Sequence, residues 1–208
     1  MTKKKTGRPL SFDRGEALLA SMHVFWAKGY EGASIKDLTS AMGINSPSLY
    51  AAFGDKHQLY LQAIDHYASN DACAPLVAFE TEPDIVQAVR SFLLAVIDYS
   101  VGNSSGVRGC FLSSCVSTSA GEVEGAQERL HSAIAETDAR IARRFELEKA
   151  RGALPESFPS FERAQLMLDL RQGYVFRCRA GQDADSMRAD IEFRVNMVLA
   201  PPLTVSPD

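Results

Sequence analysis

The sequence lacks the short motifs that mark many nucleotide-dependent, hydrolytic and metal-dependent enzymes. It contains no GxSxG, Walker A or GxGxxG segment, and its four histidines show no HExxH or other metal-ligand spacing. The four cysteines form no CxxC pair and no disulfide framework, which is typical of a reducing compartment. We therefore expect no cofactor and no metal, and an enzyme would need chemistry outside these motifs.

Long apolar runs and strand patterns are also missing. No apolar run approaches 18 residues, so no membrane span is expected. The N-terminal segment MTKKKTGRPLSFD is basic and has no apolar signal-peptide core, which favours a cytoplasmic protein. No strand-like alternation or internal repeat persists, while 46% hydrophobic residues suffice for a packed core. The predicted fold class is all-α, in one or two domains.

The net charge of −4 is unevenly distributed. Residues 1–56 carry +3 and the remainder carries −7. A modestly basic front on an acidic body fits a protein that touches DNA at one end. An acidic body is also an ordinary soluble surface, so charge alone does not decide the function.

The most informative stretch is SIKDLTSAMGINSPSLYAAFGDK, residues 34–56. Ser34 and Asp37 have the spacing of a capping box, which predicts a helix starting at Ser34. Gly43 is expected to end that helix, because glycine tolerates the positive φ of a helix C-terminus. Three apolar residues fall at helical spacing on its inner face: Ile35, Leu38 and Met42.

A second short helix follows almost at once. Asn45 or Ser46 can cap it, and Pro47 suits its first turn. Leu49 and Phe53 face inward. The outer face then carries small and polar groups, from Ser46, Ser48, Tyr50 and Ala51. Two helices joined by a glycine-containing turn predict a helix-turn-helix, whose second helix can enter the major groove of DNA.

Residues 12–60 resemble the DNA-binding domain of the tetracycline-repressor (TetR) family of bacterial transcription regulators. The resemblance covers about a quarter of the chain and rests on the order and spacing of Lys28-Gly29-Tyr30, Ser34-Ile35-Lys36-Asp37-Leu38, Gly43-Ile44, Ser48-Leu49-Tyr50, Phe53, Lys56 and Leu59. It implies a dimeric regulator with a three-helix DNA-binding domain and a helical domain for an effector and for dimerisation.

The resemblance also implies which residues touch DNA. Base or phosphate contacts are expected from Ser46, Ser48 and Tyr50 and a phosphate contact from Lys56, while Ser34 and Lys36 approach the backbone from the preceding helix. Hydroxyls and a lysine at a helix N-terminus are suited to phosphates. Many relatives carry larger residues at Ala51 and Ala52, so direct base reading by long side chains is reduced here, although alanine can contact a thymine methyl. The alternative for each residue is an ordinary exposed polar position.

Residues 1–10 carry Lys3, Lys4, Lys5 and Arg8 without an acid. One interpretation is a flexible arm, with Arg8 contacting phosphates or the minor groove. The other is a solvated tail, which is common at any N-terminus.

Amphipathic helices fill the rest of the sequence. They are expected at about 57–72, 85–99, 109–117, 124–151, 160–180 and 185–199, with Pro75 and Pro83 in a loop between the first two. The expected domains are 1–10 as an arm, 11–56 as the helix-turn-helix domain, 57–200 as the effector-binding and dimerisation domain, and 201–208 as a tail. The last two helices are apolar on two sides, which favours a homodimer through them, as the family resemblance also implies.

The segment Arg108-Gly109-Cys110 is the most distinctive local feature of the body. Similar Arg-Gly-Cys segments occur in a subset of the TetR family, some of whose members respond to reactive electrophiles or small carbonyl compounds. Arg108 and a following helix N-terminus would favour a reactive thiolate at Cys110. The alternative is a buried structural cysteine packed against Phe92 or Phe111.

A small-molecule effector would bind among the apolar faces of the body. The candidate residues are Phe92, Val96 and Tyr174, with Arg171 or Arg177 as an anchor for an anion. Such arginines more often pair with acids, here Asp169 or Glu192.

The sequence thus predicts a DNA-binding transcriptional regulator, with repression favoured, released from its operator by a small molecule or electrophile. It binds double-stranded DNA and is not an enzyme. One alternative is a thiol-dependent or ligand-binding helical enzyme that uses Cys110. Another is a sequence-indifferent DNA-associated protein, which would need a larger basic surface than the first 56 residues supply.

Overall fold

The computed structural model describes residues 12–70, 74–102 and 106–201. These residues form helices and no strand, so the prediction of an all-α fold is confirmed. The elements are α1 (Arg14–Gly32), α2 (Ile35–Met42), α3 (Ser46–Phe53), α4 (Lys56–Ser69), α5 (Ala74–Thr81), α6 (Ile85–Gly102), the π-helix η2 (Leu112–Val116), α7 (Ser117–Ser119), α8 (Ala126–Ala150), α9 (Ser160–Arg179), α10 (Ala184–Arg188) and α11 (Ile191–Leu199).

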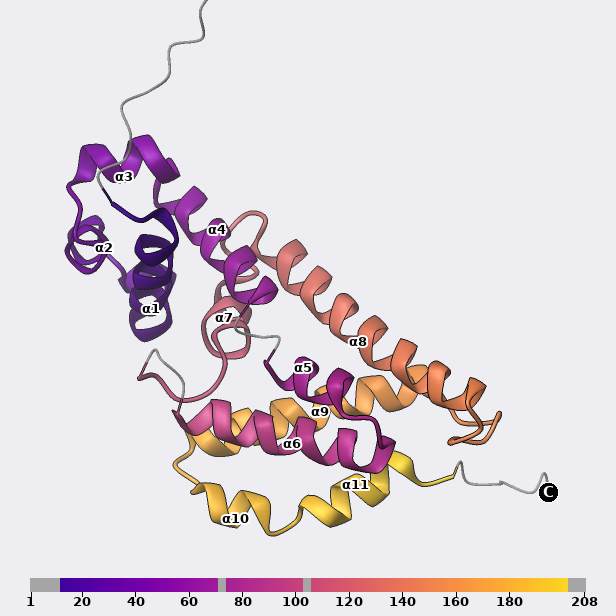
Figure 1. Cartoon of the computed structure of the whole chain (residues 1–208). Coiled ribbons are helices and arrows are strands. Elements are labelled where there is room, and N and C mark those ends of the chain that lie inside the picture. Colours follow the sequence, from indigo (N-terminus) through magenta and orange to yellow (C-terminus); the bar gives the residue numbers. More distant parts are fainter. Residues whose placement is uncertain (1–11, 71–73, 103–105, 202–208) are drawn as a thin grey trace, which may run out of the picture.

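Helices α1 to α3 form a small unit at one end of the molecule, and α4 leads from it into the body (Figure 1). The Asp13 carboxylate caps α1 by accepting a hydrogen bond from the backbone N–H of Glu16 at 2.9 Å. At Gly29, with φ 74° and ψ 170°, the backbone leaves the helical region, and one further turn follows to Gly32. The helix therefore breaks at Gly29 but resumes beyond it.

The buried apolar residues form two clusters. The first joins α1–α4 to the segment that runs from Cys110 to Ala126. The second fills the body between α5, α6, α8, α9, α10 and α11. Because η2 belongs to the first cluster, the core of the DNA-binding unit continues beyond residue 56 into the middle of the chain.

Two parts of the body differ from the sequence prediction. Residues 74–81, expected as loop, form α5, because Pro75 lies at its second position, where a helix N–H has no partner to lose. The expected helix 185–199 is divided at Asp190, whose backbone has φ −104° and ψ 9°. The Asp190 carboxylate accepts hydrogen bonds from the Tyr174 hydroxyl at 3.1 Å and from Arg194 at 2.7 Å. These contacts hold the break against α9.

The short helix expected at 109–117 is a π-helix over Leu112–Val116, continued by α7. The Ser117 N–H donates to the carbonyl of Leu112, five residues back. The Ser114 hydroxyl donates to the carbonyl of Cys110 at 2.5 Å, and the Ser117 hydroxyl donates to that of Ser113 at 2.6 Å. Serine hydroxyls thus add hydrogen bonds to the carbonyls of this segment, and the carbonyl of Cys110 accepts from the Ser114 amide at 2.9 Å as well.

Helix α6 is the one helix in the described ranges that is long and apolar enough to span a membrane by length and composition, although Arg90 and Asp98 interrupt its apolar residues. It packs between α5, α9 and α11. Its Arg90 is paired with Glu192 at 2.6 Å, and its Asp98 is paired with Arg188 at 2.5 Å. These contacts are those of a core helix in a folded domain.

One buried arginine fixes the turn between α5 and α6 to α8. Arg144 donates hydrogen bonds to four backbone carbonyls, from Phe79, Glu80, Glu82 and Pro83, at 2.8–3.2 Å. It also pairs with the buried Glu148 at 2.8 Å.

Candidate functional site

The helix-turn-helix is held by caps at both of its short helices. At α2, the Asp37 N–H donates to the Ser34 hydroxyl and the Ser34 N–H donates to the Asp37 carboxylate, each at 3.1 Å, which confirms the predicted capping box. Gly43 ends α2 at φ 65°, in the left-handed conformation that favours glycine. The Asn45 side chain caps α3 by accepting from the Ser48 N–H at 2.9 Å. The turn is therefore determined by local contacts.

Helix α3 has a buried and an open face. Leu49 and Phe53 are in the first core. Ser46 and Ser48 are half-buried, whereas Tyr50 is 51% exposed. Because the first turn contains no acid, the open face presents hydroxyls and an aromatic ring without a repelling charge.

Lys56 begins α4, next to the end of α1. Its ammonium group lies 4.5 Å from the centre of the Tyr30 ring and donates to the carbonyl of Glu31 at 3.5 Å. The cation–π contact orients the side chain beside the helix-turn-helix while the residue stays half-buried. This position suits a contact to a phosphate at the edge of the DNA.

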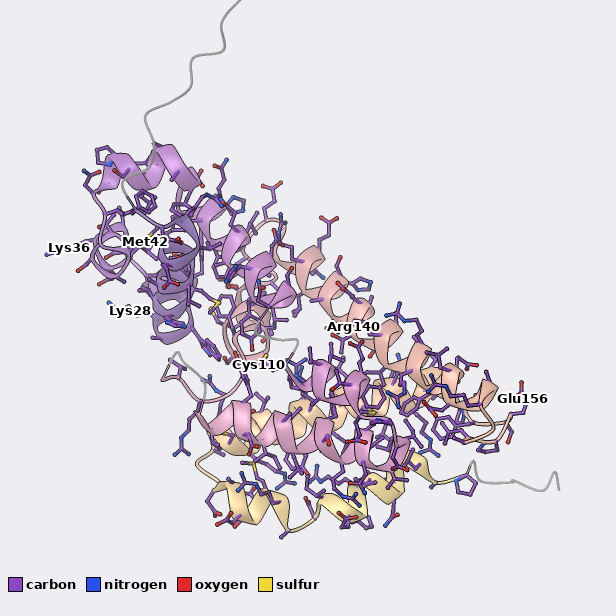
Figure 2. The ribbon with its side chains drawn as sticks, viewed as in Figure 1. Lys28, Lys36, Met42, Cys110, Arg140 and Glu156 are labelled. Carbon is purple, nitrogen blue, oxygen red and sulfur yellow. The ribbon has the colours of Figure 1, made fainter. Side chains whose placement is uncertain are left out.

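Ser34 and Lys36 differ in how free their side chains are. The Ser34 hydroxyl donates to Asp37 at 2.7 Å, and Asp37 is also paired with Lys28 at 2.6 Å. Hydrogen bonds from Lys28 and Ser34 hold the pKa of the Asp37 carboxyl well below its usual range. Lys36 is exposed and projects from α2 (Figure 2). Arg8 and the basic arm lie outside the described residues.

Comparisons with known proteins agree with this geometry. The family model described as "Bacterial regulatory proteins, tetR family" matches residues 17–63, which span α1 to α4. The chain is 28% identical to the transcriptional repressor ComR of Escherichia coli over 189 residues, covering 89% of this chain and 88% of ComR. Its N-terminal unit is a TetR-family DNA-binding domain.

Two further relatives extend the comparison. The TetR-family regulator CifR, a cysteine mutant in complex with a 26-base-pair operator duplex, has a TM-score of 0.82 at 29% identity. The match covers 91% of this chain and 98% of CifR. The transcriptional activator FasR of Mycolicibacterium smegmatis is 31% identical over 47% of this chain and 45% of FasR. This chain is a DNA-binding transcriptional regulator, and the relatives named here are transcription regulators.

The second feature of this chain is the thiol of Cys110, which is 2% exposed in the first core (Figure 2). The Tyr67 hydroxyl donates to its sulfur at 3.3 Å, and Nη2 of Arg171 donates to it at 3.7 Å. Burial opposes ionisation, but Arg171 together with hydrogen bonds from Tyr67 and Ser113 lowers the pKa of Cys110 overall.

The thiol lies against the DNA-binding unit. The ring of Phe111, next in sequence, is 5.9 Å from that of Trp26 in α1 and 5.6 Å from that of Tyr67 in α4, measured between ring centres. The Trp26 indole N–H donates to the Ser114 hydroxyl at 3.0 Å. The segment around Cys110 is thus in contact with side chains of both α1 and α4.

The structure brings together only some of the residues expected at an effector site. Arg171 is beside Cys110, whereas Phe92, Val96 and Tyr174 are in or against the second core, with Tyr174 bonded to Asp190. Arg177 is exposed, and Glu192 pairs with Arg90 instead. Sequence reasoning missed Tyr67, Trp26 and Ser114 as neighbours of the thiol, and no local pattern could have found them.

Proposed function

We propose that this chain is a homodimeric, cytoplasmic repressor that binds a near-palindromic operator and is released by an effector acting in its C-terminal domain. The open face of α3, in a fold that matches operator-bound CifR, supports DNA binding through Ser46, Ser48 and Tyr50. Lys56 and Lys36 add phosphate contacts. In such a dimer the two α3 helices lie about 34 Å apart, or a multiple of that distance.

The proposed dimer forms through α9 and α11. Three phenylalanines on these helices are unusually open, with Phe176 74% exposed, Phe193 70% and Phe161 53%. Large apolar side chains gathered on neighbouring helices are typical of a protein interface. In a dimer with two-fold symmetry, α9 and α11 of one copy would pack against α9 and α11 of the other and cover these side chains.

Sedimentation equilibrium tests the dimer. Phe193→Glu should give monomers that bind operator DNA weakly, because a charge in the centre of the interface would lose its water. Val77→Glu, at a half-exposed position on α5, is the matched control and should stay dimeric. A dimeric Phe193→Glu protein would place the interface elsewhere.

The proposed effector response uses Cys110. Its thiolate would attack an electrophilic carbon, and with an α,β-unsaturated carbonyl a sulfur–carbon bond forms while the C=C π pair moves to the oxygen as an enolate, which water then protonates. The added atoms would have to fit between η2, α1 and α4, where the core is already packed. Relief of that strain would move α4 and so change the spacing of the α3 helices.

Fluorescence anisotropy tests the whole proposal. The dimer should bind DNA from upstream of its own gene much more tightly than a scrambled duplex at near-physiological salt. An α,β-unsaturated aldehyde should release it, and Cys110→Ser should bind equally well but resist release. Equal binding to both duplexes would argue against a local operator, and release of Cys110→Ser would exclude this thiol as the sensor. Catalytic turnover independent of DNA would favour an enzyme instead.

A further inference from the structure

Arg171 is a buried cation that forms no ion pair with any acid among the described residues. Its residue is 6% exposed, and none of the ion pairs among the described residues includes it. Within the described residues, its guanidinium donates a hydrogen bond to the sulfur of Cys110 at 3.7 Å. Because a buried charge is costly unless it is paired, a counter-charge is expected at this position.

Arg171 also lines a small cavity that adjoins an open groove. The cavity, about 20 Å³, is walled by Leu76, Leu112 and Arg171, among others. It has enough space for roughly one water molecule. The neighbouring groove between α4 and α8, about 530 Å³, shares Ala68, Ala133 and Glu136 with it. The groove therefore adjoins the cavity that Arg171 lines.

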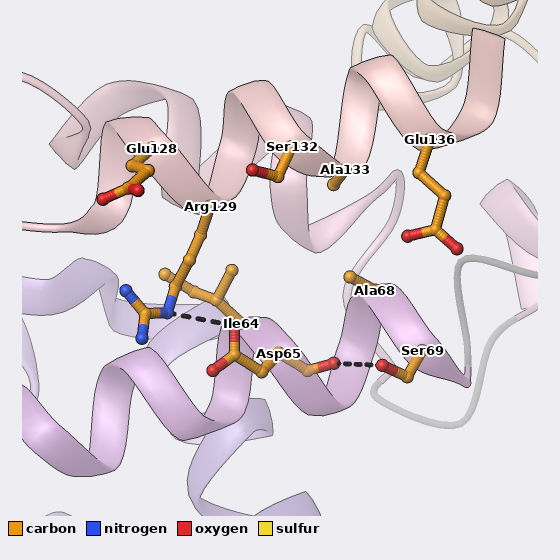
Figure 3. A pocket seen from close by; sticks show the side chains of 9 residues that line it. All are labelled: Ile64, Asp65, Ala68, Ser69, Glu128, Arg129, Ser132, Ala133 and Glu136. Carbon is orange, nitrogen blue, oxygen red and sulfur yellow. Dashed lines mark hydrogen bonds and ion pairs between the residues drawn. The ribbon is translucent and has the colours of Figure 1, made fainter. Parts of the chain in front are cut away.

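The groove is crossed near one end by an ion pair. Asp65 of α4 and Arg129 of α8 lie 3.0 Å apart, and both side chains are drawn in Figure 3. Ala68 and Ala133 face each other further along the two helices (Figure 3). Small apolar side chains at this point leave room for an apolar ligand stem between α4 and α8.

Glu136 lines the same cavity, but none of the ion pairs among the described residues joins it to Arg171. Two other species can supply the negative charge that Arg171 requires. One is the thiolate of Cys110 and the other is an anion that enters from the groove. We propose that Arg171 is the anchor of a binding site for a small organic carboxylate, whose charged group lies in the cavity and whose apolar stem lies along Ala68 and Ala133. Guanidinium–carboxylate pairing is strong and directional, which suits a buried anchor.

The other charges around the cavity are consistent with this orientation. Arg140 lies in the same wall and is paired with Glu80 at 2.6 Å. Glu136 is exposed and lines both the cavity and the groove, so water screens its repulsion of an incoming anion. A carboxylate is larger than one water molecule, so α4 and α8 must separate slightly to admit it.

Carboxylate binding and thiol ionisation then oppose each other, because both use the charge of Arg171. By linkage, a bound carboxylate disfavours the thiolate of Cys110, and a thiolate weakens carboxylate binding by the same factor. The site thus deepens the proposed function: a carboxylate would make the thiol less reactive towards electrophiles. At a pH below the pKa of Cys110, the thiolate fraction falls roughly tenfold for each unit by which a bound carboxylate raises that pKa. Reactions of the thiolate slow by the same factor.

The test measures alkylation of Cys110 by iodoacetamide in the intact protein at pH 7, followed by peptide mass spectrometry. Benzoate is the probe, and neutral benzamide of nearly the same shape is its control. We expect benzoate to slow the alkylation of Cys110 several-fold and benzamide to leave it unchanged. Equal effects of the two, or none from benzoate, would overturn the proposal.

Variants identify the anchor. Arg171→Gln should alkylate more slowly without ligand and lose the response to benzoate, whereas Arg177→Gln, an exposed position on the same helix, should behave as the parent. A benzoate effect that persists in Arg171→Gln would refute the site. If Arg171→Gln does not fold, Cys110→Ser is used. Benzoate and not benzamide should raise its melting temperature, and no rise would count against the proposal.

This measurement is independent of the sensor role. If alkylated Cys110 still left DNA binding intact, the proposed effector response would fail, while benzoate protection in the same samples would still support the carboxylate site.

Discussion

The indole N–H of Trp26 donates a hydrogen bond at 3.0 Å to the hydroxyl of Ser114, 88 residues further along the chain. The same hydroxyl donates to the carbonyl of Cys110 at 2.5 Å. A side chain of the first helix is thus joined through one serine to the backbone of the thiol residue. The DNA-binding unit and the thiol segment are parts of a single packed core.

A double-mutant cycle measures this connection. Trp26→Phe and Ser114→Ala should each destabilise the protein, and the coupling between them should be about 0.5–1.5 kcal/mol, the contribution of one net hydrogen bond. Urea unfolding of the four proteins gives the value. Ser117→Ala, in an exposed position of the adjacent α7, should cost less than about 0.5 kcal/mol. Additive effects of the two substitutions would mean that the bond contributes nothing.

The capping box predicts a particular acid response. Asp37 has a pKa below its ordinary value because Lys28 and Ser34 bond to its carboxylate. A carboxyl whose pKa is lower in the folded than in the unfolded state stabilises the protein at any pH above its unfolded-state pKa, which is about 3.9 for an aspartate. This contribution is lost as the pH falls through the folded-state pKa. In Lys28→Gln the NMR titration of Asp37 should shift to higher pH, and stability should begin to fall at higher pH. Lys36→Gln, on the same helix, should leave the titration in place.

Lys56 should affect affinity without affecting sequence preference. Lys56→Gln should weaken binding to operator and scrambled DNA by similar factors and reduce the slope of log K against log salt by about 1, as expected for one lost phosphate contact. Lys149→Gln, near the far end of α8, should change neither quantity. A loss confined to the operator would show that Lys56 reads bases or positions α3 instead.

Arg144 should be the most damaging single charge to remove. Arg144→Met leaves four backbone carbonyls without their donor and removes one of the two arginines that pair with the buried Glu148, so we expect a loss of about 3–5 kcal/mol. Arg143→Ala, at the exposed neighbouring position, should change stability by less than about 0.5 kcal/mol. Chemical denaturation compares them. A small loss in Arg144→Met would mean that water replaces the guanidinium.

The helix-turn-helix could be predicted from sequence because its signals are local. Ser34 and Asp37 cap α2 within a single turn, and Gly43 and Asn45 mark the end of one helix and the start of the next. Each interaction joins residues three apart, so spacing alone identifies it. The all-helical body followed from apolar periodicity in the same way.

The remainder could not be predicted because it depends on distant partners. Pro75 indicates a loop by composition, yet tertiary packing of Leu76 and Phe79 stabilises a helix there. The break at Asp190 needs Tyr174, 16 residues away, and the environment of Cys110 needs Arg171, 61 residues away. A sequence pattern identifies the arginine and the cysteine but not their contact.

The π-helical turn at Leu112–Val116 makes chain length, and not only residue type, a determinant of where the thiol points. A π-turn accommodates about one residue more than an α-turn. Deleting a single residue within it would let the segment close as an α-helix and rotate everything before it by about 100°. Cys110 and Phe111 would then leave Tyr67 and Trp26, even though every side chain in contact had been kept. Between homologues, a one-residue gap at this place would separate proteins with this thiol environment from those without it.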